Sequence, residues 1–287
     1  MTKLKVILIL VACLSGVSTV WAQVSLTKGG SGADEFELVK SGKAAKLYYD
    51  IRDFEVIKKS AHLFSNDVRL VTDREIAVSE AVEEMSSNCI IVGTLGHNEL
   101  IDKLILKKKL DVSTLKDKWE SFHIEVVRNP FPGVKKALVV VGSDRRGTAY
   151  GLFSISESIG VSPWYWWADA PVAKRKELCL KVQKMTSEEP TVKYRGIFIN
   201  DEDWGLLRWA KTNFEKERGN IGPKTYAKVC ELLLRLKANY LCPAMHEAST
   251  AFNKIPENKL VADSFAIVMG SVHCEPLLFN NASEWDK

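Results

Sequence analysis

The feature that most constrains the fold is an alternation of strand and helix patterns that begins at Thr191. Residues 193–200, 238–246 and 265–273 each hold a short apolar run that ends in polar residues, which predicts a strand. Residues 222–237 carry apolar side chains at helical spacing, which predicts a helix between the first two strands. Apolar strands with polar groups at their carboxyl ends are typical of a (β/α)8 barrel, whose active site is built from the loops that follow the strands.

Residues 36–190 also alternate between strand-like and helix-like patterns, which predicts an α/β domain with a sheet covered by helices. The predicted strands are residues 46–51, 88–96, 122–127 and 136–143, and the predicted helices are residues 98–108 and 148–160. Residues 54–71 predict a helix followed by a short strand. Residues 174–190 predict a strand and a linker, which puts a domain boundary near Pro190.

We therefore expect the fold class α/β. An N-terminal α/β sandwich-like domain, residues 23–190, precedes the first part, about three strands, of a (β/α)8 TIM barrel at residues 191–287. A complete barrel takes about 250 residues, and residues 191–287 supply roughly three of its eight strands. We expect the chain to be a piece of a longer protein.

The first 22 residues predict a secretory signal peptide. Two lysines precede an apolar stretch at residues 6–21, and cleavage is expected after Ala22. The stretch is short of the roughly 20 apolar residues that a membrane span needs, so we expect no span and a periplasmic or secreted protein. A lipobox-like sequence that ends at Cys13 leaves lipoprotein anchoring as the alternative.

Charge and cysteine content exclude several classes of protein. The net charge is +4, from 40 basic and 36 acidic residues, without a basic tract of the kind that binds nucleic acid. Five cysteines remain after the signal peptide, an odd and scattered set that is no disulfide framework. We expect buried free thiols. These five are Cys89, Cys179, Cys230, Cys242 and Cys274.

Polar clusters follow all three predicted barrel strands. They are Asn200, Asp201, Glu202, Asp203 and Trp204 after the first, His246 and Glu247 after the second, and His273 and Glu275 after the third. Neighbouring parallel strands lie about 4.8 Å apart, so these side chains can line one pocket. Carboxylates and imidazoles hydrogen-bond hydroxyl groups, and an indole stacks on the apolar face of a sugar. The clusters therefore favour a polyhydroxylated ligand.

Two other interpretations of these clusters stay open. In a regular strand Asp201 and Asp203 share one face, and only one pair of acids faces the pocket while the other is solvated. A zinc site at His246 and His273 is the competing chemistry, although no closely spaced ligand pair supports it. We expect no metal and no cofactor.

An aromatic segment at residues 161–171, VSPWYWWADAP, precedes the predicted domain boundary. Four consecutive aromatic residues flanked by prolines do not fit a regular surface helix. They favour packing between two domains, or an aromatic surface near a sugar site, and both can hold together.

Several long motifs in a fixed order give this chain a family likeness. YRGIFINDEDWGL at 194–206, GNIGPKTYAKVCELLLRLKANYLCPAMH at 219–246, TAFNKIPENKLVAD at 250–263 and IVMGSVHCEP at 267–276 resemble the start of the catalytic barrel of glycoside hydrolase family 115. Residues 142–171 resemble the end of that family's N-terminal α/β domain. The resemblance covers most of the chain after the signal peptide.

The resemblance implies a xylan α-1,2-glucuronidase that removes glucuronic acid or its 4-O-methyl ether from xylan side chains with inversion. Inversion needs two carboxyl groups about 6.5–9.5 Å apart. By resemblance, Asp203, Glu202, His246 and His273 fall on motifs that line the pocket, and Asp203 and His273 are the best sugar ligands. Asn200, Trp204 and Glu275 complete the expected substrate site.

The resemblance places better candidates for the catalytic acid and base on later strands, beyond residue 287, so we assign neither here. Cys242 stands where a Trp is usual in the family, which is expected to loosen barrel packing. Arg145 and Arg146 are candidates to clamp the substrate carboxylate, but we expect them to hold the turn before a helix. The resemblance implies a polysaccharide partner and leaves room for a homodimer of a full-length protein.

Two alternatives to an enzyme remain at this point. One is a non-catalytic carbohydrate-binding remnant, and the other is a periplasmic domain whose residues only pack.

The 287-residue chain by itself is predicted not to release glucuronic acid from glucuronoxylan, because about five of the eight barrel strands are not in it. Release of uronic acid in proportion to added purified chain contradicts this prediction.

Overall fold

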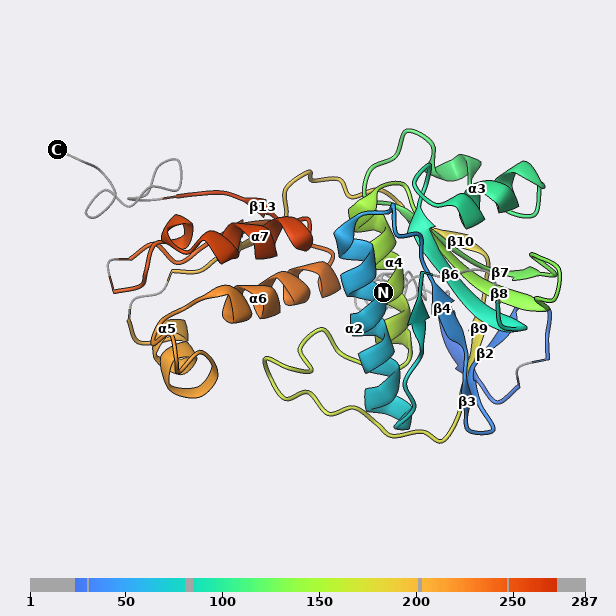
Figure 1. Ribbon diagram of the computed structural model, residues 1–287, viewed down its shortest axis with the longest axis horizontal. Helices are drawn as coiled ribbons and strands as arrows, with labels where there is room; N and C mark the ends of the chain where they lie inside the picture. The colour runs from blue at the N-terminus through green and yellow to red at the C-terminus, as the bar shows by residue number, and fades with distance from the viewer. Residues whose placement is uncertain (1–23, 30, 81–84, 201–202, 247, 273–287) are drawn as a thin grey trace, which may run out of the picture.

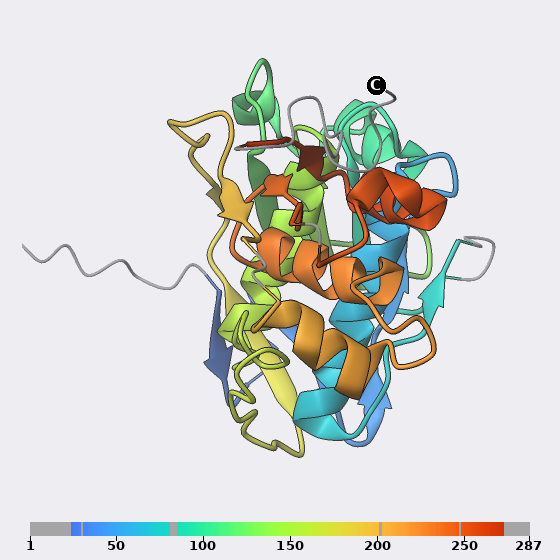
Figure 2. The ribbon, with the colours of Figure 1, turned by 90° about the vertical axis from the view of Figure 1, so that its left-hand side faces the viewer.

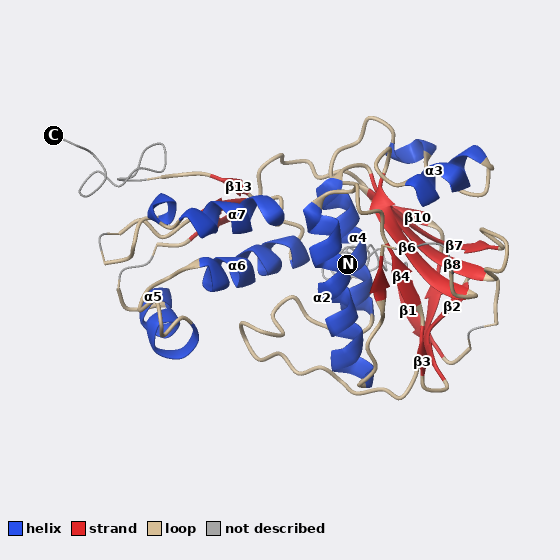
Figure 3. Cartoon of the chain, in the orientation of Figure 1, coloured by secondary structure: helices blue, strands red, loops and turns tan. Residues whose placement is uncertain are grey.

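A computed structural model describes residues 24–29, 31–80, 85–200, 203–246 and 248–272 of the chain (Figure 1). The α/β fold class is confirmed, with helices and strands interleaved along the chain (Figure 3). The predicted signal peptide and Cys13 lie outside the described residues. Within them, no helix is long and apolar enough to cross a membrane.

The strands form three sheets. The first has the order β1 (Val24–Thr27), β9 (Leu178–Val182), β2 (Glu35–Lys40), β3 (Lys43–Ala44) and is antiparallel. The second has the order β10 (Met185–Thr186), β7 (Phe122–Arg128), β8 (Lys136–Gly142), β6 (Asn88–Thr94), β4 (Lys46–Tyr48), β5 (Val78–Ser79). Strands β8, β6, β4 and β5 of this sheet are parallel, and β10 and β7 are antiparallel to their neighbours. The third is the parallel sheet β11 (Gly196–Phe198), β12 (Tyr240–Cys242), β13 (Val268–Met269).

Six α-helices are described. They are α2 (Glu55–Thr72), α3 (Glu99–Leu106), α4 (Arg145–Ser158), α5 (Leu206–Trp209), α6 (Pro223–Arg235) and α7 (Pro256–Ser264). Short turns of other helix types lie at η1 (Ser113–Leu115), η2 (Ala210–Phe214) and η3 (Phe252–Lys254).

Alternation along β6 divides the core of the N-terminal part in two. Ile90 and Val92 pack with α2 and α4 in the larger apolar cluster, whereas Cys89 and Ile91 pack with α3 in the smaller one. Successive side chains of a strand point to opposite faces, so a strand covered on both sides must be apolar throughout. This accounts for the continuous apolar run in the sequence of β6.

The sequence prediction for residues 54–71 is wrong in one respect, since no strand follows the helix there. Helix α2 continues to Thr72, and Asp73 ends it in the left-handed conformation with φ of 57°. Val68 and Val71 are completely buried and extend the apolar stripe of the helix, in register with Phe64. The β-branched residues that suggested a strand therefore continue a helical face.

The chain after Pro190 follows the predicted alternation of strand and helix. Helix α6 connects β11 to β12 and helix α7 connects β12 to β13, and all three strands are parallel. Figure 1 shows this unit to the left of α2 and α4, with the other two sheets to the right. In the turned view of Figure 2, α6 and α7 lie in front of α2 and α4, and contacts join α4 to α6 and α2 to α7. Closure of these strands into an eight-stranded barrel stays a prediction.

A buried carboxylate, Glu120, fixes the amino ends of these strands to the N-terminal part. Its side chain is completely buried and accepts hydrogen bonds from Arg146 Nε, Arg195 Nη2 and Asn239 Nδ2. Arg195 directly precedes β11 and Asn239 directly precedes β12. Arg146 Nη1 also donates to the carbonyl oxygen of Ala266, two residues before β13, at 3.1 Å.

A second buried ion pair joins α6 to α2. Arg235 donates two parallel hydrogen bonds of 2.9 Å to the Asp67 carboxylate, and a third to Glu231. Tyr165 Oη donates to the same Glu231 at 2.9 Å. The side chains of Asp67 and Arg235 are 0% and 2% exposed, so water stabilises neither charge and each depends on its partner.

The predicted free, buried thiols are confirmed for Cys89, Cys179, Cys230 and Cys242, whereas Cys274 lies outside the described residues. Burial raises the pKa of the Cys89 and Cys230 thiols to about 12. These two thiols are therefore uncharged and poor nucleophiles at neutral pH.

Replacement of Asp67 with Asn is expected to lower the free energy of unfolding by about 3 kcal/mol, because it leaves the buried Arg235 guanidinium without its bidentate partner. Urea denaturation followed by circular dichroism measures this change. The matched control is Asp73→Asn at the end of the same helix, where the ion pair with Lys174 is solvent-exposed. Equal midpoints for both variants contradict the prediction.

Candidate functional site

The described candidate residues follow the carboxyl ends of β11 and β12. The two strands are parallel and paired in register, with Phe198 opposite Cys242. The pairing extends one residue further, since the amide of Ile199 donates to the carbonyl of Cys242 at 2.9 Å. Parallel strands end at a common edge, so the residues that follow β11 and β12 emerge side by side.

Asn200, Asp203 and Trp204 follow β11 at this edge and are exposed, with 75% of Trp204 accessible. Asp203 has a left-handed backbone with φ of 67°, and its carbonyl oxygen accepts a hydrogen bond from Arg208 Nε at 2.7 Å. Left-handed residues occur in turns and not within strands. The strand alternation used to assign faces to Asp201 and Asp203 therefore does not extend to Asp203.

His246 follows β12 at the same edge and is exposed. Its carbonyl oxygen accepts hydrogen bonds from the amide and the hydroxyl of Ser249, both at 2.9 Å, which closes a tight turn after the strand. The turn fixes where the backbone leaves the sheet after β12, at the edge where β11 also ends.

The remaining candidates cannot be placed. Asp201, Glu202, Glu247, His273 and Glu275 lie outside the described residues. Within the described part of the chain, no group of three or more His, Cys, Asp or Glu side chains is arranged to hold a metal ion. The zinc alternative relied on His273 and is therefore not tested by the structure.

Tyr240 on β12 lies against Gly270, which directly follows β13. Its ring lies over Gly270, where a Cβ atom would come within 1.6 Å of the phenol oxygen. Gly270 is thus required by the ring and not by its own backbone angles. Cys242, two residues along β12, lies on the same face of the strand as Tyr240 and is buried.

Arg145 and Arg146 lie at the start of α4, as expected, and not at the strand ends. The guanidinium of Arg145 lies 5.6 Å from the ring centroid of Phe54, and Arg146 is held by Glu120. Asp144 caps the helix by accepting from the amides of Arg146 and Gly147. Arg145 therefore packs within the N-terminal part, and Arg146 joins that part to the parallel strands.

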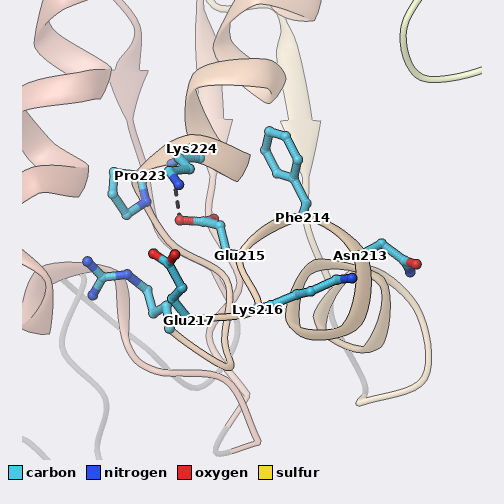
Figure 4. Close-up of a pocket in the computed structure, with 8 residues that line it drawn as sticks. Asn213, Phe214, Glu215, Lys216, Glu217, Pro223 and Lys224 are labelled. Atoms are coloured by element: carbon cyan, nitrogen blue, oxygen red, sulfur yellow. Dashed lines mark hydrogen bonds between the residues drawn. The ribbon is translucent and has the colours of Figure 1, made fainter.

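Sequence analysis missed Glu215, which is 4% exposed beside a hollow of about 640 Å³ (Figure 4). Its carboxylate accepts from the amides of Gly222, Lys224 and Thr225 and from the Thr225 hydroxyl. These amides lie at the N-terminus of α6 and have no partner within the helix. Glu215 caps them, although it stands seven residues before Gly222 in the sequence. Sequence patterns for helix caps cover only the few residues around the helix start, so they do not predict a cap seven residues away.

A second hollow, of about 570 Å³, lies between the aromatic segment and the loop after β11. It is lined by Tyr165, Trp166, Trp167, Asp169, Gly205, Leu206 and Trp209. Gly205 directly follows Trp204, so this hollow and the candidate sugar site share one loop. The predicted packing role of the aromatic segment is confirmed, because Trp167 Nε1 donates to the carbonyl of Lys228 on α6 at 3.1 Å.

Comparison with known proteins identifies relatives of this chain. Residues 187–287 match the model of glycosyl hydrolase family 115. Among solved structures, the chain is similar to BtGH115A, a family GH115 4-O-methyl-α-glucuronidase with specificity for decorated arabinogalactans. The two share 38% sequence identity with a TM-score of 0.74, over 87% of this chain and 31% of that one. The chain thus spans 31% of the length of this relative.

Two weaker similarities have TM-scores below 0.5 and support no argument. CpGH84D is 10% identical with a TM-score of 0.48, over 86% of this chain and 35% of that chain. An N-acetyl-β-hexosaminidase from Streptomyces plicatus is 10% identical with a TM-score of 0.47, over 86% of this chain and 43% of that chain. No curated protein matches the chain.

Replacement of Glu215 with Gln is expected to lower the free energy of unfolding by about 2 kcal/mol, because a buried carboxylate that accepts several hydrogen bonds is lost from the start of α6. Thermal or urea unfolding measures the effect. Glu217→Gln is the control, since Glu217 lines the same hollow but is exposed. An unchanged Glu215→Gln variant shows that the cap does not stabilise the helix.

Proposed function

The chain belongs to glycoside hydrolase family 115, and from this premise we propose that its protein is an exported α-glucuronidase that removes glucuronic acid or its 4-O-methyl ether from polysaccharide side chains. One observation carries the proposal: the 38% identity to a 4-O-methyl-α-glucuronidase extends over 87% of this chain. The chain covers 31% of that enzyme, so the activity of the whole protein is a proposal and does not follow from the similarity alone.

The strand ends support this proposal by their chemistry. Asp203 and Asn200 offer oxygen atoms that accept hydrogen bonds from sugar hydroxyls, and His246 offers a ring N–H to a hydroxyl or carboxylate oxygen. Trp204 is exposed and presents an indole face for stacking. In this proposal Glu202, His273 and Glu275 complete the substrate site.

Hydrolysis in this proposal proceeds with inversion. A carboxylic acid protonates the leaving oxygen while a carboxylate removes a proton from the attacking water, and the two lie about 6.5–9.5 Å apart. We assign neither role to a described residue. Asp203 acts in the proposal as a sugar ligand that positions the anomeric carbon.

Two domains carry these roles in our proposal, an N-terminal α/β domain at residues 23–190 and the beginning of a TIM barrel at residues 191–287. Support comes from the change at Pro190, after which the described strands form a separate parallel sheet. In this proposal the N-terminal domain binds the amino ends of the barrel strands and fixes their position.

The polysaccharide is expected to be a glucuronate-decorated xylan. The relative's specificity for decorated arabinogalactans makes that polymer the second substrate to test. Both carry an acidic sugar on a neutral main chain, and the proposed site recognises the acidic sugar.

The test measures uronic acid released from both polymers by the protein expressed from its complete gene. Release from at least one polymer is expected. In the same protein, Asp203→Asn and His246→Ala are expected to lower kcat/KM by about tenfold or more, because each removes a contact to the sugar. Asn tolerates the left-handed backbone at position 203, so the first variant tests the charge and not the fold.

Asp263→Asn and His62→Ala are the matched controls, because both residues are exposed on helices away from the strand ends. Both are expected to leave kcat/KM unchanged. Failure to release uronic acid from either polymer contradicts the proposed activity, and sugar binding without release supports the non-catalytic alternative.

A further inference from the structure

The hollow of about 570 Å³ beside the candidate site is rich in aromatic residues. Four of its seven lining residues are Tyr165, Trp166, Trp167 and Trp209. All four are half-buried, so each ring is partly packed and partly accessible. The accessible part of each ring can contact a ligand, because Trp and Tyr rings combine a large apolar face with one polar atom.

The rings hold each other in fixed orientations. Trp166 meets Trp167 edge-on with centroids 4.8 Å apart, and meets Trp209 edge-on at 5.5 Å. Trp209 in turn stacks on Phe214 at 5.4 Å with an interplanar angle of 27°. Such contacts restrict ring rotation, so the walls of the hollow are preorganised.

Polar atoms of two rings point into the protein and not into the hollow. Trp167 Nε1 donates to the carbonyl of Lys228, and Tyr165 Oη donates to Glu231. Both partners lie on α6, behind the rings. The hollow is therefore lined by ring surface together with polar surface, and its charged lining residue is the exposed Asp169.

We propose that this hollow binds a neutral sugar unit of the polysaccharide main chain, adjacent to the decorated unit whose uronic acid enters the strand-end site. This inference rests on the proposed function. Ring faces stack on the C–H faces of a pyranose, and the Asp169 carboxylate accepts hydrogen bonds from its hydroxyls.

Two observations favour this occupant. Gly205 and Leu206 line the hollow and directly follow Trp204, so a glycan bound at Asp203 and Trp204 continues into the hollow along one loop. The seven lining residues include no Lys, Arg or His, so none of them offers a cation or an imidazole to a uronate carboxylate, whereas the strand-end site offers His246. Lys228 lies 5.1 Å from the Trp166 ring, but its ammonium is paired with Glu231 at 2.9 Å.

The test measures binding of xylohexaose, an undecorated oligosaccharide, and of free glucuronic acid to the 287-residue chain by isothermal titration calorimetry. Trp166→Ala is expected to weaken xylohexaose binding about tenfold and to leave glucuronic acid binding unchanged. Trp166→Phe keeps a ring in the cluster and is expected to give a smaller loss. The control is Trp164→Ala, since Trp164 is exposed and does not line the hollow.

Absence of xylohexaose binding to the unmodified chain at millimolar concentration overturns the inference. Unchanged affinity in Trp166→Phe and in a folded Trp166→Ala protein also overturns it. Asp203→Asn separates the two claims, because it is expected to weaken glucuronic acid binding alone. If xylohexaose binds through Trp166 while the protein from the complete gene releases no uronic acid, the proposed glucuronidase function fails and the neutral-sugar site stands.

Discussion

The placement of the candidate site depends on one buried carboxylate. Glu120 receives hydrogen bonds from Arg146, Arg195 and Asn239, and Arg146 continues to the backbone before β13. These contacts tie the amino ends of all three parallel strands to the N-terminal part. A buried ion network of this kind costs desolvation energy and is weak evidence for net stability, but its directional bonds fix geometry. Because the amino ends are fixed, the carboxyl ends, which Asp203 and His246 follow, lie on the side away from the N-terminal part.

A second set of contacts sets the orientation of α6 and, through it, the aromatic hollow. Asp67 and Arg235 lock α6 against α2, while Tyr165 and Trp167 hydrogen-bond the same helix from the aromatic segment. Helix α6 thus contacts both α2 and the aromatic segment, and it leads into β12. Asp67 and Arg235 bind no sugar in this proposal but position α6, whereas Tyr165 and Trp167 both contact α6 and line the hollow.

The sequence predicted the alternating strands and helices after Thr191 because their apolar runs and polar ends are local patterns. It also placed the thiols and the aromatic segment correctly. The short strand after α2 was wrong, since β-branched residues such as Val68 and Val71 fit a helix when their face is buried. Glu120 and Asp67 were missed because they bond to residues distant in sequence, and Glu215 was missed because it caps α6 from outside the usual capping positions. The alternation of side chains along a strand did not predict the direction of Asp203, because its left-handed backbone places it in a turn after the strand.

The central claim is that the carboxyl ends of β11 and β12 form a uronic acid site. The most direct measurement is an NMR titration of the histidine ring signals of the chain with glucuronic acid, and in parallel with glucose. The account predicts that glucuronic acid shifts the His246 signals in a saturable manner, that glucose shifts them less, and that the signals of His62 on α2 do not move. Unmoved His246 signals at saturating glucuronic acid contradict the account.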